Sequence, residues 1–407
     1  MREINLDNLD DIARGAGILG TGGGGDPYIG KLLAREAIRK YGPVRLVAFD
    51  EVPADATVVP VSGMGAPTVL LERVPAGGEE VAALRALEKH IGRAATHIAP
   101  IEVGGVNSML PIACAAEAGL PLVEGDAMGR AFPEAQMVLP GLIGVANTPM
   151  ALADDKGNSI IVDAVSNHAA ERIARAVCVE LGCQISSADT VMRGDQLVDG
   201  LVPDTLTLAE RLGAAVREAR AAHTDPVLAA RTMLSGTHLL TGKVIDVSRR
   251  TQGGFARGNA RIEGIGDDAG RVLELGFQNE HLLATLDGET VATTPDLICV
   301  LDTDTGDPVT TEGLRVSVLA APCDPRWTTP GGLALAGPRY FGYGVDYPPF
   351  REIRPPGRTT PAPGRSAPRG PAGHCLSPSG PFLRPRACRS SWTRRRRPVP
   401  AARSDRR

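Results

Sequence analysis

The spacing of apolar residues divides the chain into two folded regions. Up to about residue 165, short apolar runs alternate with stretches in which apolar residues recur at helical spacing. This alternation is typical of an α/β fold with a mostly parallel sheet. It predicts helices over residues 6–19, 27–41, 78–91, 107–118 and 167–181, and strands over residues 44–49, 57–61, 97–103, 120–123 and 159–165.

Beyond residue 183 the pattern is mainly that of β-strands. A helical stretch over residues 206–233 precedes short segments of alternating apolar and polar residues, separated by turns such as Asp287-Gly288. Strands are predicted over residues 237–247, 258–265, 271–277, 280–286, 296–301 and 314–320. We therefore expect an α/β domain over residues 1–166 and a β-rich, mostly antiparallel domain over residues 167–353.

The last 54 residues differ in composition from everything before them. Residues 354–407 hold 14 arginines, 11 prolines, no lysine and a single acid, Asp405, whereas the rest of the chain is strongly acidic. Such a segment cannot bury a core, and we expect it to be disordered. It could be an anion-binding arm, a polyproline linker or the product of out-of-frame translation. The simultaneous loss of lysine and acids favours the third explanation, which an intact reading frame through codon 407 would contradict.

Composition excludes several classes of protein. Hydrophobic residues make up 43% of the chain, enough for full cores, yet no run approaches the about 20 apolar residues of a membrane span. The acidic N-terminus does not have the pattern of a signal peptide. Seven scattered cysteines without CxxC spacing indicate free thiols in a reducing compartment, and we expect a cytoplasmic protein. The acidic folded part disfavours partnership with nucleic acid.

The glycine run in residues 20–30, GTGGGGDPYIG, is the strongest local signal. Glycine carries the highest entropic cost of ordering, so such a run is expected where the backbone bends through positive φ or lies against a ligand. Asp26-Pro27 then begins a helix, whose free N–H groups suit an anion. No Walker lysine follows and no strand precedes, so nucleotide binding is not the default, and a flexible turn is the plain alternative. Expected ligand-binding residues are Gly22, Gly23, Gly24, Gly25 and Asp26.

Three predicted strands end in further glycine-rich loops, over residues 62–65, 102–107 and 124–130. In an open α/β sheet, ligands lie outside the carboxyl ends of the strands. Carboxylates there can activate water or bind a metal, although capping of the next helix is the plain alternative. This reasoning predicts catalytic acids at Glu102, Glu124 and Asp126, and substrate contacts at Gly63, Gly65, Gly104, Gly105 and Asn107.

The β-rich half adds Glu280, His281 and Arg257. Glu280 and His281 lie in a polar cluster that breaks the alternation of a strand, and such violations often mark sites. Arg257 follows a second glycine-rich loop and could bind a carboxylate in bidentate fashion. No HxH or HExxH spacing occurs, so a divalent metal such as zinc would need ligands from distant segments. The sequence leaves the cofactor undetermined.

Six segments together resemble the S-methyl-thiohydantoin desulfurase-like family, long described as a domain of unknown function and often encoded beside hydantoinase/oxoprolinase genes. They are GTGGGGDPYIG (20–30), EVGGVNSMLPIA (102–113), GLPLVEGDAMGRAFPE (119–134), GKVIDVSRRTQGGFARG (242–258), FQNEHLLA (277–284) and PDLICVLDTDTG (295–306). The resemblance implies an N-terminal α/β and a C-terminal β-rich domain. It stops near residue 353, soon after GPRYFGY (337–343), which supports out-of-frame translation of the tail.

The resemblance also implies a hydrolase. Water would attack the ring carbon between two nitrogens of a thiohydantoin that carries a carboxylate side chain, and a thiol would leave. We expect Glu124, Asp126 or His281 to activate water, Asn107 to donate to the ring oxygen, and the glycine run with Arg257 to hold the carboxylate. Alternatives are a hydrolase of ordinary cyclic amides, or a non-catalytic subunit of a hydantoinase/oxoprolinase system. A homo-oligomer is compatible with either, and no membrane partner is expected.

Overall fold

A computed structural model describes residues 2–65, 69, 75–309 and 313–350. The described residues belong to one compact unit, which spans Met1–Gly357. The expected disordered tail over residues 354–407 lies outside the described residues. Within the described part, no helix has the length and apolar character needed to cross a membrane.

The first sheet is mixed, not mostly parallel as predicted. Its strands run in the order β1 (Arg2–Ile4), β2 (Val44–Val47), β5 (Leu122–Val123), β4 (His97–Pro100), β3 (Thr57–Gly65), β9 (Gln184–Ala188), β7 (Met150–Ala153) and β8 (Ser159–Val162), with β10 (Met192–Arg193) also paired to β3. Only the four strands from β2 to β3 are parallel. The short turn between β7 and β8 forces those strands to be antiparallel. Both β9 and β10 come from beyond residue 166.

The second sheet is antiparallel throughout, as predicted. Its order is β16 (Glu289–Thr293), β15 (Glu280–Leu286), β14 (Val272–Gln278), β13 (Phe255–Gly264), β12 (Thr237–Gln252), β18 (Arg315–Ala321) and β17 (Leu297–Asp302). The sheet curls, because β15 and β17 are far apart in this order yet His281 Nδ1 of β15 lies 2.8 Å from the carbonyl oxygen of Ile298 of β17. Its core is built mainly from aliphatic residues.

The loop expected around residues 251–258 is a tight hairpin. Strand β12 continues to Gln252 and β13 begins at Phe255, so Gly253 and Gly254 alone make the turn. Both glycines have positive φ, of 61° and 82°. Such a turn matches the twist of the two strands, which explains why the strands extend further than the sequence pattern indicated.

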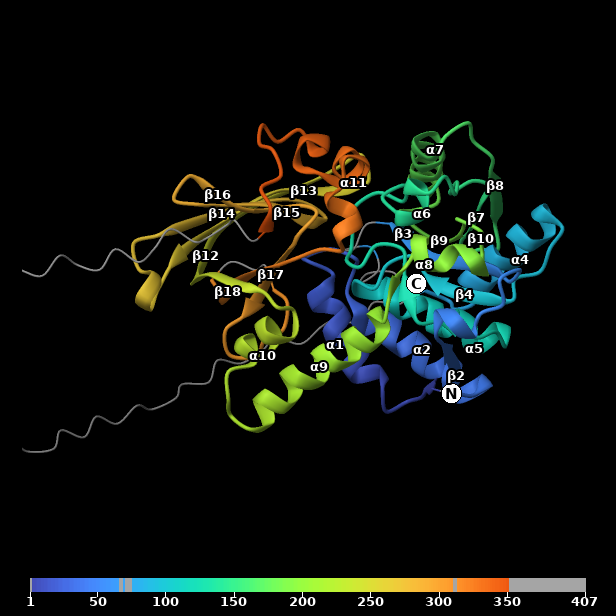
Figure 1. The fold of residues 1–407 in the computed structure, drawn as a ribbon, viewed down its shortest axis with the longest axis horizontal. Helices are drawn as coiled ribbons and strands as arrows, with labels where there is room; N and C mark the ends of the chain where they lie inside the picture. Colours follow the sequence, from blue (N-terminus) through green and yellow to red (C-terminus); the bar gives the residue numbers. More distant parts are fainter. Residues whose placement is uncertain (1, 66–68, 70–74, 310–312, 351–407) are drawn as a thin grey trace, which may run out of the picture. The chain divides into compact units, whose positions relative to one another are not determined.

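Helices lie along both sheets (Figure 1). They are α1 (Leu9–Leu19), α2 (Pro27–Tyr41), α4 (Glu79–Ile91), α5 (Leu110–Ala118), α6 (Leu139–Leu142), α7 (Asn167–Glu180), α8 (Leu197–Gly200), α9 (Thr205–Ala221), α10 (Pro226–Met233) and α11 (Pro330–Ala336). The helix predicted over 206–233 is two helices, because Asp225 caps a new one at Pro226 and accepts from the backbone N–H of Val227. A short two-stranded sheet pairs β6 (Gly125–Asp126) with β11 (Val202–Pro203).

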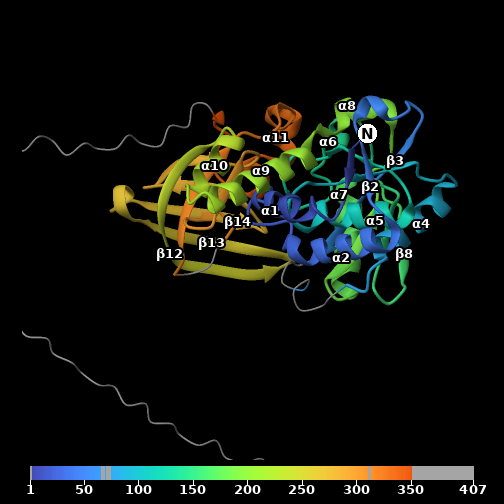
Figure 2. The same ribbon diagram turned by 90° about the horizontal axis from the view of Figure 1, so that it is seen from below.

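Helix α1 connects the two sheets and places the glycine run that follows it. It runs beside α9 (Figure 2). The two backbones meet at glycines: a Cβ on Gly15 would lie 1.8 Å from the carbonyl oxygen of Ala209, and one on Gly213 would lie 1.9 Å from that of Asp11. The aliphatic side chains of α1 belong to a core that also contains Leu301 of β17. The end of α1 is therefore fixed against both sheets.

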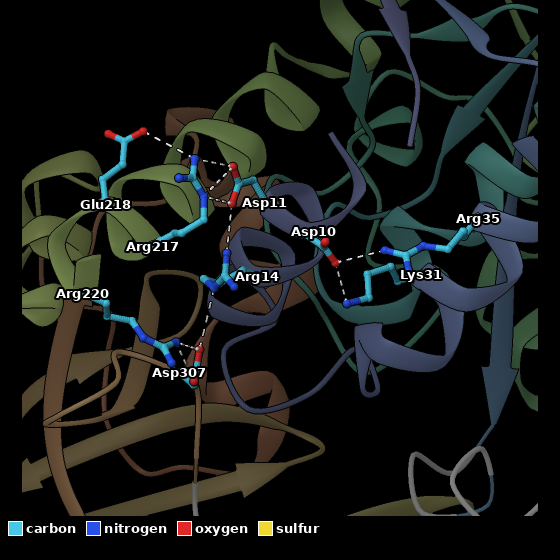
Figure 3. A network of polar contacts seen from close by, with 9 residues as sticks. All are labelled: Asp10, Asp11, Arg14, Lys31, Arg35, Arg217, Glu218, Arg220 and Asp307. Atoms are coloured by element: carbon cyan, nitrogen blue, oxygen red, sulfur yellow. Dashed lines mark hydrogen bonds and ion pairs between the residues drawn. The ribbon is translucent and has the colours of Figure 1, made fainter. Parts of the chain in front are cut away.

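Ion pairs surround α1 on its exposed sides (Figure 3). Asp10 contacts Lys31 of α2 at 2.7 Å, while Asp11 accepts from the guanidinium of Arg217 of α9 at 2.9 Å. Asp307 of the loop after β17 contacts Arg220 of α9 at 3.1 Å. Exposed pairs of this kind contribute at most about 1 kcal/mol each, so the buried glycine contacts, not these charges, fix the position of α1.

Candidate functional site

A cavity of about 130 Å³ lies where the glycine run, the ends of β3 and β4, and the turn between β14 and β15 meet. Among the sequence-predicted residues, those that line it are Gly24, Gly25, Gly63, Gly65, Glu102, Asn107 and Glu280. The first sheet therefore contributes strand-end loops, as expected of an α/β fold. Glu280 comes from the second sheet, so the cavity requires both halves of the chain.

The glycine run packs directly against the side chains of Glu280 and His281. A Cβ on Gly23 would lie 2.0 Å from Glu280 Oε1, and one on Gly22, whose φ is +89°, would lie 2.3 Å from His281 Nε2. The backbone N–H of Gly24 donates to Glu280 Oε1 at 3.0 Å. The anion that this loop binds here is therefore a carboxylate of the chain itself. Side chains at these positions would displace the pair.

The second glycine pair, Gly104 and Gly105, allows one loop to pack on another. A Cβ on Gly105 would lie 2.2 Å from the carbonyl oxygen of Gly24, and one on Gly104 would lie 2.8 Å from the Cα of Gly20. The backbone N–H of Val106 donates to that same Gly24 carbonyl at 2.8 Å. These two glycines hold the glycine run in place and are absent from the cavity wall.

Glu280 and Glu102 are the sequence-predicted acids that line the cavity. Glu280 is 2% exposed, and its Oε2 has no hydrogen-bond partner in the described part of the chain. Burial raises its pKa to about 7, although the Gly24 N–H and the charge of Arg130 oppose the shift. Burial and the charge of Glu280 raise the pKa of Glu102 well above its ordinary value. Burial thus favours the protonated form of both carboxyl groups.

Asn107 holds Glu102 in position. Its Nδ2 donates to Glu102 Oε1 at 2.6 Å, while its Oδ1 accepts from the backbone N–H of Gly63 at 2.7 Å. The other oxygen of Glu102 accepts from the backbone N–H of Phe132 at 3.3 Å. The amide expected to donate to a substrate oxygen is thus already engaged with the carboxyl group beside it.

His281 lies beneath the cavity and does not line it. Its Nδ1 is 2.8 Å from the carbonyl oxygen of Ile298, and its backbone N–H donates to the carbonyl of Thr21 at 2.7 Å. Burial lowers its pKa to about 4, so the ring is neutral at physiological pH. These contacts fit a residue that fixes the neighbouring Glu280 against the glycine run.

Arg130, which the sequence analysis did not single out, joins the same segments from below. It is fully buried, donates to Thr21 Oγ1 at 2.6 Å and to the carbonyl of His281 at 3.2 Å, and also bonds the carbonyl of Asp296. One cation thus connects the glycine run with β15 and with the segment before β17. The arginine stands inside the EGDAMGR segment, but nothing in its local pattern distinguishes it from an exposed arginine.

Glu124 and Asp126 are directed away from the cavity. Glu124 contacts Arg2 at 3.1 Å and accepts from the backbone N–H of Thr207 at 3.0 Å. Asp126 is fully buried, and its Oδ2 accepts from the backbone N–H groups of Val103, Met128 and Gly129 at 2.8 to 3.1 Å. Burial raises the pKa of Asp126 to about 7 despite those bonds. These contacts shape the loops around the cavity.

Two other predicted residues also lie off the cavity wall. Arg257 is exposed on β13, 5.7 Å from the ring of Phe255, and Asp26 caps α2 by accepting from the backbone N–H of Tyr28 at 2.8 Å. The cavity instead contains acids that the sequence analysis did not identify, among them Glu79, Glu80 and Asp189. Their positions depend on how α4 and β9 join the first sheet, which local pattern does not reveal.

The described residues contain no group of three or more His, Cys, Asp or Glu side chains placed to hold a metal ion. The five described cysteines, Cys114, Cys178, Cys183, Cys299 and Cys323, form no disulfide.

Comparison with known proteins identifies relatives over both halves. Residues 7–164 match the family described as S-Me-THD-like, N-terminal domain, and residues 165–350 match S-Me-THD-like, C-terminal domain. A crystal structure of a protein from Chromobacterium violaceum is similar, with 25% sequence identity and a TM-score of 0.71, over 86% of this chain and 100% of that chain. No curated protein matches the sequence.

Proposed function

The chain belongs to the S-Me-THD-like family, and on that premise we propose that it hydrolyses an S-alkyl-thiohydantoin or a closely related ring, releasing a thiol. The observation that carries the proposal is Glu280. It lines the cavity, one of its carboxyl oxygens is buried without a partner among the described residues, and its pKa is about 7. A general base works best when its pKa lies near the working pH.

Glu280 and Glu102 divide the proton transfers between them. Environments that push the pKa values of two carboxyl groups apart supply a base and an acid in one site. Ionised Glu280 takes a proton from water as the water oxygen bonds to the ring carbon between the nitrogens. Protonated Glu102 gives its proton to the adjacent ring nitrogen. The carbon is then tetrahedral, with a hydroxyl group and the sulfur substituent.

Collapse of this intermediate restores both carboxyl groups. The hydroxyl oxygen forms the new carbonyl and returns its proton to Glu102, the carbon–sulfur bond breaks, and the leaving sulfur takes the proton held by Glu280. The products are a hydantoin and a thiol, and water is the only other reactant. Asn107 acts as a positioning residue in this scheme, because it is bonded to Glu102.

Thiol release by the full chain tests the proposal. The protein is incubated with 2-methylthio-imidazolone, the S-methyl form of thiohydantoin, while a thiol reagent follows methanethiol and mass spectrometry follows hydantoin. We expect kcat/KM to rise with pH through about 7, as Glu280 loses its proton. Glu180→Gln, at an exposed site on α7, is the matched control. Turnover that survives Glu280→Gln would contradict the assignment.

The same preparation separates the alternatives. Hydantoin opening without thiol release would indicate a cyclic-amide hydrolase. Ring binding without any turnover, together with copurification of a hydantoinase/oxoprolinase subunit, would indicate an ancillary module. Metal analysis of the purified chain, compared with turnover before and after chelation, tests whether a divalent ion such as zinc contributes.

A further inference from the structure

The turn that precedes Glu280 contains a half-buried residue with positive φ, Asn279. Strand β14 ends at Gln278 and β15 begins at Glu280, so Asn279 alone connects the two strands, and its φ is 58°. Both Asn279 and Glu280 line the cavity. Positive φ is uncommon for residues other than glycine, and residues held in sparsely populated conformations cluster at functional sites. This turn is therefore a candidate for contact with the ring.

The side-chain amide of Asn279 is held through its oxygen. Its Oδ1 accepts from the backbone N–H of Ala256 at 2.8 Å, and the backbone N–H of Asn279 donates to the carbonyl of Ala256 at 2.7 Å. The first bond also establishes which atom of the amide is the oxygen. Its Nδ2 donates to no described residue. A residue of the cavity wall thus has an amide donor of fixed orientation without a protein partner.

Stability of the turn accounts for the oxygen of this amide but not for its nitrogen. Glycine adopts positive φ at no steric cost, and aspartate, like asparagine, is enriched in this conformation. An aspartate would also accept from the Ala256 N–H. What asparagine adds at this position is an uncharged side chain with two N–H donors.

Two other side-chain donors of the cavity wall already have partners. Asn107 donates to Glu102 and to the carbonyl of Gly63. The guanidinium of Arg175 is paired with Glu171 at 2.8 Å. Neither group is available to a ring oxygen without breaking these contacts, whereas the Asn279 donor is.

We propose that Asn279 Nδ2 donates to the ring carbonyl oxygen of the substrate. The inference rests on the proposed function, in which the ring lies beside Glu280. As water adds to the carbon between the nitrogens, the electron pair of the carbon–nitrogen double bond moves onto the adjacent nitrogen. It is shared with the carbonyl oxygen until Glu102 protonates that nitrogen. A donor at this oxygen stabilises the charge as it develops. Asn279 thus takes the role expected of Asn107.

Binding of product-like rings tests this contact without turnover. Isothermal titration of the full chain compares 5-butylhydantoin with 4-butyl-2-imidazolidinone, which lacks the ring carbonyl beside the side arm. We expect the hydantoin to bind at least about tenfold more tightly, a difference of about 1.4 kcal/mol. In Asn279→Gly and in Asn279→Asp this preference should fall to about threefold or less.

The two variants distinguish the donor from the turn. Asn279→Gly permits the same backbone conformation but loses the bond to Ala256, whereas Asn279→Asp keeps that acceptor and loses the donor. Gln184 also lines the cavity, and its Oε1 is buried without a partner in the described part of the chain. Gln184→Ala therefore tests a competing amide and should keep the preference. Circular dichroism checks folding, and Asn279→Asp alone decides if Asn279→Gly is unfolded.

Four results would overturn the inference: no preference in the unmodified protein, a preference that survives in Asn279→Asp, a preference lost only in Gln184→Ala, or no binding of either ring. Failure of the hydrolase proposal is a different result. In that case thiol release is absent from the unmodified protein while the preference for the hydantoin and its dependence on Asn279 remain.

Discussion

Two pairs of buried acids, Glu102 with Glu280 and Glu124 with Asp126, stand in equally glycine-rich surroundings yet have different partners. Glu102 and Glu280 line the cavity, and Glu280 keeps one oxygen without a partner. Glu124 faces Arg2, and Asp126 Oδ2 accepts from three backbone N–H groups, while its Oδ1, like Glu280 Oε2, is buried without a partner among the described residues. Burial raises the pKa of all four. Neither a raised pKa nor an unfilled buried oxygen therefore distinguishes the two pairs by itself, whereas their position at or away from the cavity does.

The largest effect is expected from Glu280→Gln, which tests whether the acids at the cavity carry the activity. Glu280→Gln keeps the shape and the acceptor for the Gly24 N–H but cannot take a proton. We expect kcat for thiol release to fall by about 10²–10⁴-fold, the usual contribution of general acid–base catalysis. Steady-state kinetics with folding checked by circular dichroism measure this. A fall of less than about fivefold would show that Glu280 is not the general base.

The second test changes the glycine run that packs against Glu280 and leaves the acid itself intact. Gly23→Ala places a Cβ 2.0 Å from Glu280 Oε1, so the carboxylate or the loop must move. Overpacking of this kind typically costs about 1–3 kcal/mol, and we expect both the free energy of unfolding and kcat to fall. Gly344→Ala, where nothing lies within 4 Å, is the control for chemical denaturation. Equal stability of the two variants would show that the glycine run is looser than its contacts indicate.

The third test uses pH. Between the ordinary value of 4.5 and about 7, the unfolded chain has ionised Glu280 while the folded chain keeps it protonated, so this group lowers stability as pH rises. The stability of Glu280→Gln relative to the unmodified protein should therefore increase from pH 4.5 to about 7 and then level off. Each pKa unit corresponds to about 1.4 kcal/mol, and solvent relaxation will reduce the total. Urea titrations at several pH values check the sign, and a flat difference would refute it.

The smallest effect on activity is expected for the pair that lies away from the cavity, Glu124 and Asp126. Glu124→Gln weakens the contacts with Arg2 and Thr207, and charge-assisted hydrogen bonds of this kind contribute about 1.5–3 kcal/mol when buried. We expect a loss of about 1 kcal/mol of stability, because Arg2 is partly exposed, with kcat within about twofold of the unmodified protein. Thermal melts and the thiol assay report both quantities. A large loss of kcat with unchanged stability would mean that the two pairs had been assigned in reverse.

The local sequence pattern predicted most helices and strands. Its predictions were least accurate for strands that pair with segments far away in the sequence. Helices such as α2 and α7 were predicted within about a residue, since capping and helical spacing are local. Strands β7 and β9 were missed and the sheet was taken as mostly parallel, because β9 pairs with β3 across more than a hundred residues. Glu102 was predicted from its glycine-rich loop and Glu280 from a polar cluster that breaks a strand pattern, but their roles depend on contacts that the sequence does not reveal.

The contact between Gly24 and Glu280 spans 256 positions of the chain. The glycine run leaves the ribosome early, and the carboxylate that fits it is synthesised near the end of the folded part. A nascent or truncated chain that stops before residue 280 therefore has the glycine run but lacks the carboxylate that binds to it. The proposed hydrolase activity, which requires the contact between Gly24 and Glu280, is therefore expected only of chains that extend beyond residue 280.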